Sequence, residues 1–231
     1  MCIRDRLFYC PFLSQPAIES QSVHSFSERQ HFIAIGNFRH EPNWDSVLWL
    51  KHQLWPMIRA QLSAVGMAHA ELHIYGAYPP PKATQLHNAK EGFHIKGWAA
   101  DAQAVMQRAK VCLAPLRFGA GIKGKLMDAM RCGTPSITTS IGIESMSGGL
   151  PWGGQAADSA DEFVAAAVLH YMDENTWQRK QQLGFTILRD YFQREDYSLA
   201  LQRRISELVD NISRERRENF IGQMLRHHHH K

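Results

Sequence analysis

The chain has 231 residues, of which 44% are hydrophobic and 21% are charged, and its formal net charge is +4 at pH 7. This composition can bury a sizeable core, which excludes a disordered or low-complexity protein. The longest purely apolar run, residues 163–169, is far short of the roughly 20 residues that a membrane-spanning helix needs. Basic residues are spread along the chain rather than gathered in one patch, so the sequence predicts no nucleic-acid partner.

The cysteines indicate a reducing compartment. Cys2, Cys10, Cys112 and Cys132 form no CxxC pair and have no histidine at zinc-finger spacing. This pattern argues against a disulfide scaffold and against a structural zinc site, and it favours the cytoplasm. The charged start of the chain does not resemble a signal peptide. We therefore expect a cytoplasmic protein without a metal site, and a peripheral position at the inner membrane face stays open.

The first 29 residues do not read as part of a folded domain. Residues 1–6, MCIRDR, match one translated frame of a common sequencing-library transposon end, so we expect this hexapeptide to be an artefact and the chain to be a fragment. Residues 7–29 contain Pro11, Pro16 and several serines, which is typical of a linker or of the remnant of a missing N-terminal domain.

From residue 30 onward, short apolar segments alternate with segments of helical periodicity. Strands are expected at residues 31–35, 71–75, 93–97, 111–115 and 135–139, and helices at residues 45–62, 82–89, 101–109 and 123–131. Further helices are expected at residues 161–172, 174–192 and 198–220.

This alternation predicts an α/β fold with a Rossmann-like, doubly wound parallel sheet. The folded domain is expected at residues 30–195, followed by a C-terminal helix and basic tail at residues 196–231. Ligands of such sheets bind beyond the carboxyl ends of the strands. The loops after Ile35, Tyr75, Gly97 and Pro115 are therefore the places to look for a site.

The segment APLRFGAGIKGKLMDAM, residues 114–130, combines a strand, a glycine loop and a lysine-rich helix start. Glycines allow a phosphate to approach the backbone, and the amino terminus of a helix favours an anion. Lys123 and Lys125 add two positive charges, and Asp128, one turn further on, could accept hydrogen bonds from a ribose. A plain helix with solvated lysines is the equally open alternative, because a glycine loop before a helix is a weak signal.

Three other groups of polar residues are candidates for a function. Arg39, in GNFRHEPN at residues 36–43, could bind phosphate through two hydrogen bonds, although the segment could also be a polar turn. The arginines of residues 203–226 alternate with carboxylates, which is typical of a solvated helix face, with a membrane or an acidic partner as the alternative. His227 to His230 read as a tail or an appended tag rather than a metal site. Patterns for serine hydrolases, HExxH metalloproteases and Walker loops are absent.

Taken together, these segments resemble a known family. The order GNFRHEPNWD, a helix with Trp55 and Pro56, HIYGAY, Gly97 with Trp98, and APLRFGAGIKGKLMDAMRCGTPSITTS is similar to the C-terminal half of family 4 (group 1) retaining glycosyltransferases. The resemblance covers residues 32–192 and implies the GT-B architecture, in which two Rossmann-like domains face each other across a cleft.

The resemblance also implies roles for particular residues. Gly36, Asn37 and Arg39 would face the diphosphate of a nucleotide-sugar donor, and Gly97 and Trp98 would lie by its base. The remaining expected contacts to phosphate, sugar and ribose are Arg117, Gly119, Ala120, Gly121, Lys123, Lys125 and Asp128.

The family chemistry implied is transfer of a sugar with retention, without a cofactor or an essential metal. Its acceptor would be a glycan, a lipid-linked molecule or a small molecule. The family's catalytic histidine belongs to the N-terminal domain, which residues 1–29 cannot supply, so no catalytic residue is assignable in this half.

Two positions depart from the family pattern. Asp128 stands where the family usually has the second glutamate of its EX7E motif, and Ala120 replaces the first.

Two other functions stay open. A sugar-nucleotide epimerase shares the architecture, but it needs carboxylates near the sugar, and Ala120 argues against them. The alternative from another class is a non-catalytic module that binds nucleotide, or that docks on a membrane or partner through its basic C-terminal helix.

Overall fold

The computed structural model describes residue 8, residues 23–192, residues 194–219 and residue 224. Contacts divide the chain into a compact unit that ends at Phe192 and a second unit that contains α9 (Arg194–Asp210) and α10 (Ile212–Glu218). The expected artefact at residues 1–6 and the histidines at 227–230 lie outside the described residues. Among the described helices, none combines the length and apolarity needed to cross a membrane.

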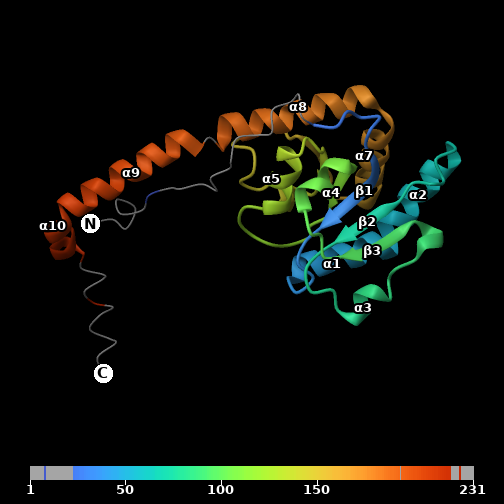
Figure 1. Ribbon diagram of the computed structural model, residues 1–231, viewed down its shortest axis with the longest axis horizontal. Helices are drawn as coiled ribbons and strands as arrows, with labels where there is room; N and C mark the ends of the chain where they lie inside the picture. The colour runs from blue at the N-terminus through green and yellow to red at the C-terminus, as the bar shows by residue number, and fades with distance from the viewer. Residues whose placement is uncertain (1–7, 9–22, 193, 220–223, 225–231) are drawn as a thin grey trace. The chain divides into compact units, whose positions relative to one another are not determined.

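The compact unit is built on a parallel sheet of six strands in the order β3-β2-β1-β4-β5-β6 (Figure 1). Each strand pair is parallel and each crossover contains helix, which confirms the doubly wound α/β fold. The strands are β1 (Gln30–Ile35), β2 (Leu72–Tyr75), β3 (Phe93–Gly97), β4 (Ala109–Ala114), β5 (Ser136–Thr138) and β6 (Gly154–Ala156).

Helices cover both faces of the sheet. The helices of this unit are α1 (Glu41–Trp49), α2 (Trp55–Ala64), α3 (Pro81–Thr84), α4 (Ala102–Arg108), α5 (Gly124–Arg131), α6 (Ser140–Ile143), α7 (Ala160–Met172) and α8 (Glu174–Tyr191). The main core lies between α1, α2 and α7 and the sheet face that carries Phe32, Leu72 and Val111. The other face carries Ile33 and Cys112 and packs against α4 and α5. α8 packs on α5.

Several boundaries differ from the sequence prediction. The helix expected from residue 45 begins at Glu41, because Pro42 occupies a first-turn position, where a missing N–H is tolerated. A π-helical segment, Leu50–Leu54, and a short 3-10 helix, Ala89–Glu91, were not predicted. The helix expected at residues 198–220 is instead two helices that meet at Asn211.

A buried arginine, Arg29, fixes the residue before β1 to β4 and to the residues that follow α5. Arg29 is 1% exposed, and its guanidinium donates to the backbone oxygens of Ala109 and Cys132 and to Thr134 Oγ1. Its guanidinium also lies 5.0 Å from the ring centroid of Trp177. Burial lowers the pKa of Arg29 to about 10, which leaves it charged at neutral pH. This residue fixes the chain immediately before β1 against β4 and the end of α5.

Candidate functional site

Two loops that are far apart in the sequence meet at the carboxyl ends of the central strands. The loop after β1 and the loop between β4 and α5 together line a cavity of about 270 Å³. This is where the topology of a doubly wound sheet places ligands. The lining residues are Gly36, His40, Pro42, Asn43, Leu116, Phe118, Gly119, Ala120, Ile122, Lys123, Gly124 and Lys125.

The shape of the first loop depends on a glycine and two asparagines. A Cβ atom at Gly36 would lie 2.7 Å from the side chain of Asn43, so a larger residue there would displace the loop. Asn43 donates to the backbone oxygen of Asn37, while the Asn37 side chain accepts from the backbone N–H of Arg39. These hydrogen bonds hold the loop in a turn that brings Asn43 to the cavity.

Hydrogen bonds fix the ends of the strands beneath the second loop. Thr138 Oγ1 donates to the backbone oxygen of Ala114, and Thr139 Oγ1 to that of Leu116. Ser46 Oγ joins the backbone oxygen of Pro115 to α1. The loop itself needs glycine, because Gly119 and Gly121 have φ angles of +124° and +76°, which side chains disfavour.

Lys123 is the most unusual charged group in the cavity. It is only 9% exposed, and its ammonium nitrogen has no hydrogen-bond partner in the described part of the chain. A buried ammonium without a partner is costly, which makes an anionic ligand the expected partner. Its backbone N–H is held by Met146 Sδ at 3.3 Å, and Lys123 caps the amino terminus of α5. Backbone donors and the positive helix end therefore lie at the same place.

Lys125, two residues after Lys123 and in the first turn of α5, adds a second cationic group. Its Nζ donates to Asn43 Oδ1 at 2.5 Å, which joins the first turn of α5 directly to the first turn of α1. Burial lowers the pKa of Lys125 to about 8. The ammonium is therefore mostly charged at neutral pH but easily neutralised above it. An anion placed beside it would raise this pKa again.

The two predicted arginines lie outside the cavity lining. Arg117 makes a two-pronged ion pair with Asp45, at 2.8 and 2.5 Å, which joins the second loop to α1. The Arg39 guanidinium stacks on Tyr78, 4.1 Å from its ring centroid. Asp45 lies in the interior of α1, so its carboxylate pairs with Arg117 rather than capping the helix.

The other predicted contacts do not line the cavity. Gly97 ends β3 with a φ angle of +73°, and its carbonyl accepts from the Gly76 N–H. Trp98 is 73% exposed, so its ring is available to stack on a planar ligand. Asp128 is half-buried in α5, its pKa is raised by burial, and Arg131 lies 3.7 Å from its carboxylate.

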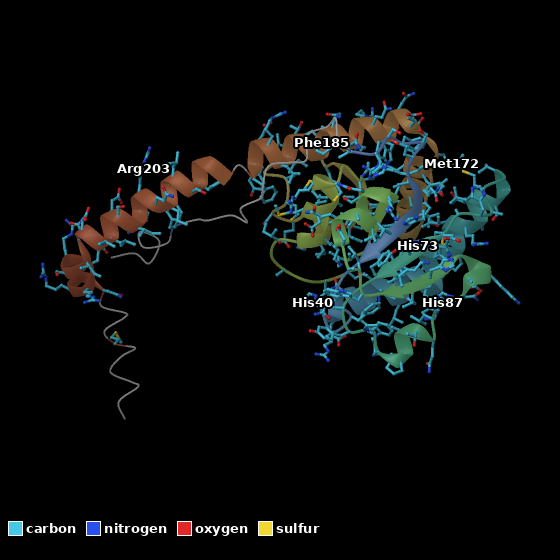
Figure 2. The ribbon with its side chains drawn as sticks, viewed as in Figure 1. His40, His73, His87, Met172, Phe185 and Arg203 are labelled. Atoms are coloured by element: carbon cyan, nitrogen blue, oxygen red, sulfur yellow. The ribbon has the colours of Figure 1, made fainter. Side chains whose placement is uncertain are left out.

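The cavity also contains side chains that the sequence analysis did not assign. His40, Asn43 and Phe118 line it, and Figure 2 shows His40 in the loop beyond β1. Asn43 lay in the segment flagged after the first strand, so its position there was the available signal. Its contact with Lys125 bridges residues 82 positions apart, which local patterns cannot reveal.

Comparison with protein families identifies the family of this chain. The family model described as glycosyl transferases group 1 matches residues 29–173, which include every loop of the site. The chain belongs to the group 1 glycosyltransferases. Among curated protein sequences, none gives a significant match.

Solved structures show the same fold in glycosyltransferases. A TarM mutant from S. aureus, in complex with Fondaparinux, alpha-GlcNAc-glycerol and UDP, matches with a TM-score of 0.62 and 12% identity over 82% of this chain and 37% of that chain. The pneumococcal O-GlcNAc transferase GtfA, in complex with UDP and GlcNAc, matches with a TM-score of 0.59 and 16% identity over 81% of this chain and 38% of that chain.

WaaG, a glycosyltransferase involved in lipopolysaccharide biosynthesis, matches with a TM-score of 0.53 and 14% identity, over 75% of this chain and 46% of its own. The chain therefore has the Rossmann-like fold of one half of GT-B enzymes. It spans less than half the length of these solved structures.

Proposed function

We propose that this chain is the donor-binding half of a retaining glycosyltransferase and that its cavity binds the diphosphate of a nucleotide-sugar. The observation that carries the proposal is the buried ammonium of Lys123, which has no hydrogen-bond partner among the described residues. Lys123 is one of the residues that line the cavity, at the start of α5. A diphosphate would supply the missing acceptor oxygens and the compensating charge. Lys125 and the first backbone N–H groups of α5 would share that charge.

This arrangement suits stabilisation of a leaving group. In glycosyl transfer the bond between the anomeric carbon and the diphosphate oxygen breaks, and its electron pair leaves on the diphosphate. The oxygen of an acceptor hydroxyl forms the new bond to the anomeric carbon and gives up its proton to a base. Fixed positive charge beside the departing diphosphate lowers the barrier because negative charge grows there in the transition state. Lys123, Lys125 and the α5 amino terminus would do this without a metal ion.

Base and ribose contacts follow from the neighbouring residues. The exposed ring of Trp98, at the carboxyl end of β3, would stack on the base. Asp128 would accept the ribose hydroxyls, and Arg39 would reach the diphosphate only by leaving the ring of Tyr78. Acceptor recognition and the catalytic histidine belong, on this proposal, to a second domain in a longer protein.

A titration of the full chain against UDP, GDP, ADP, dTDP and CMP tests the proposal. UDP comes first, because TarM and GtfA were solved with it. We expect one nucleotide to raise the thermal midpoint, since a ligand of the folded state stabilises it by about 2.7 kcal/mol at 100 times its dissociation constant.

Lys123→Met then tests the site itself. Removing a charge-assisted contact worth about 1.5–3 kcal/mol weakens binding about 10- to 100-fold. Lys90→Met is the matched control, because Lys90 is exposed and lies outside the cavity. The proposal fails if a cooperatively folded chain binds none of the nucleotides, or if Lys123→Met binds as tightly as Lys90→Met.

A further inference from the structure

A second cluster of polar side chains lies near the amino ends of the strands, away from the donor loops. His31, His73 and His94 are each the second residue of β1, β2 and β3, respectively, and Glu71 immediately precedes β2. His73 pairs directly with His94 in the β2–β3 register. Because side chains alternate along a strand, Glu71 and His73 share a face. The sheet therefore gathers two imidazoles and a carboxylate on one side of its edge.

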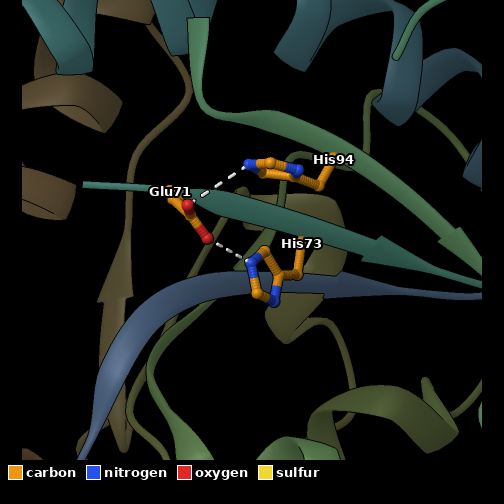
Figure 3. Close-up of side chains that lie close together, drawn as sticks. All are labelled: Glu71, His73 and His94. Atoms are coloured by element: carbon orange, nitrogen blue, oxygen red, sulfur yellow. Dashed lines mark hydrogen bonds and ion pairs between the residues drawn. The ribbon is translucent and has the colours of Figure 1, made fainter. Parts of the chain in front are cut away.

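The distances in this cluster are those of groups that could share one ion. Figure 3 shows the Glu71 carboxylate between the two rings, with His73 Nε2 2.7 Å from Oε2 and His94 Nε2 3.4 Å from Oε1. One ligand atom from each residue lies within 4.8 Å of the others. Tetrahedral zinc, with bonds of about 2.0–2.2 Å, requires ligand atoms roughly 3.4 Å apart. The carboxylate oxygen near His73 would need to withdraw by about 0.7 Å to reach that spacing.

The surrounding groups leave room for such a change. The Glu71 side chain is 46% exposed, while those of His73 and His94 are only 12% and 13% exposed, so the carboxylate has more room to move than the rings. The His31 ring stacks on His73 with centroids 3.9 Å apart and fixes its orientation. An open cavity of about 470 Å³, lined by His31, Glu71 and His73 among others, gives access to the cluster.

The proposed ligand atom of His94 has only a weak partner. Within the described residues, His94 Nε2 is buried and makes no hydrogen bond, and it meets only the Glu71 carboxylate, at 3.4 Å. His31 Nε2 and His73 Nδ1 are likewise buried without a hydrogen bond. A metal ion would therefore displace no strong contact of His94.

We propose that Glu71, His73 and His94 form a zinc site that joins the edge strand β3 to β2, with a water molecule as the fourth ligand. Two imidazoles and one carboxylate suit Zn²⁺ better than they suit Mg²⁺ or Ca²⁺, which prefer oxygen ligands. β3 is an edge strand of the sheet, so a metal cross-link holds it where strand pairing is available on one side only. The site is separate from the donor cavity and does not depend on the proposed function.

The histidines at 227–230 complicate any metal-binding measurement, because they could bind Zn²⁺ by themselves. All four are therefore replaced by serine in the test protein. Thermal unfolding provides a second safeguard. A histidine tail binds metal equally in the folded and unfolded chain and leaves the midpoint unchanged, whereas a site assembled by two strands exists only in the folded state.

With the tail replaced, we expect one Zn²⁺ per chain in competition with a chromophoric chelator. At 100 times its dissociation constant, Zn²⁺ should raise the thermal midpoint by about 5–10 °C. Co²⁺ in its place should give the visible absorption of four-coordinate cobalt.

Variants of the ligands decide whether this cluster is responsible. His94→Ala and Glu71→Gln should each weaken Zn²⁺ binding by at least about tenfold, since even the loss of a group that only supports a ligand costs 10- to 100-fold. His52→Ala, at an exposed histidine elsewhere, should change nothing. Glu71→Gln keeps the shape of a half-exposed side chain and remains decisive if His94→Ala does not fold. No Zn²⁺ stabilisation of the tail-replaced chain, or unchanged affinity in Glu71→Gln, would overturn the proposal.

Discussion

Replacing Lys125 by methionine separates what this ammonium does for a ligand from what it does to the fold. Methionine keeps the length and apolar stem of lysine and removes the charge. The pKa of Lys125 falls from an ordinary 10.5 to about 8 because of burial. Each pKa unit corresponds to about 1.4 kcal/mol, so the folded state disfavours the charged form by about 3 kcal/mol.

Two effects reduce the gain that methionine would bring. Lys125 is partly exposed, and its hydrogen bond to Asn43, which contributes about 1 kcal/mol, is lost. We therefore expect Lys125→Met to raise the free energy of unfolding by about 1–2 kcal/mol at pH 7. The thermal midpoint should then rise by about 2–8 °C.

The pH dependence gives the sharper signature. Because the folded pKa lies below the unfolded value, the unfolded chain binds more protons between about pH 8 and 10.5, and the native protein gains stability relative to Lys125→Met through that window. The advantage of the variant should therefore be full below pH 8 and fall through that window, and by about pH 10.5 the lost hydrogen bond should leave the variant about 1 kcal/mol less stable. Urea denaturation at pH 7 and pH 10, with Lys90→Met as control, measures this difference. A variant that is less stable at pH 7, or whose advantage is independent of pH, would refute the reasoning.

Three further outcomes are expected. Arg29→Ala should lower the free energy of unfolding by about 3 kcal/mol, because it leaves buried carbonyls of Ala109 and Cys132 without their donor. Arg29→Lys should restore little of this in urea denaturation, and a loss below about 1 kcal/mol would contradict the role. Asp128→Ala should weaken binding of a nucleoside diphosphate by calorimetry but leave binding of inorganic pyrophosphate unchanged; equal losses would rule out a ribose contact. Between pH 8 and 9, affinity for the nucleotide should fall by up to about tenfold, since Lys125 with a pKa of about 8 must take up a proton to bind an anion, and Lys125→Met should abolish that dependence.

The strands were predictable because each buried strand has its own short apolar run. Gln30–Ile35 and Phe93–Gly97 lie within one residue of their predicted bounds. Gly154–Ala156 was missed, because a segment rich in glycine reads as a loop. The structure gives the physical reason for that glycine: a Cβ atom at Gly154 would collide with the backbone of Ser136.

The location of the site could be predicted from the sequence, but the side-chain contacts within it could not. Parallel strands end at one edge of a sheet, so the loops at Gly36 and Gly119 were expected to lie near each other, and the cavity brings them together. The partners of the arginines, Tyr78 for Arg39 and Asp45 for Arg117, depend on side chains from other elements. No local pattern specifies such pairs.

The histidine cluster was missed for a related reason. Zinc-finger spacing does not describe it, because His73 and His94 lie on adjacent strands that are separated along the chain by a turn and two short helices. Only the register of the sheet brings them opposite each other. The available signal was the Glu71 and His73 pair, two residues apart at a strand start, with a histidine in the next strand.

The central claim is that the buried ammonium of Lys123 binds a diphosphate. A crystal structure of the full chain with the nucleoside diphosphate that stabilises it tests this claim most directly. The account predicts phosphate oxygens within hydrogen-bond distance, about 3 Å, of Lys123 Nζ and of the first backbone N–H groups of α5. It also predicts that Lys125 donates to phosphate in place of, or as well as, Asn43. A nucleotide bound at another place, or a phosphate group that leaves Lys123 without a partner, would contradict it.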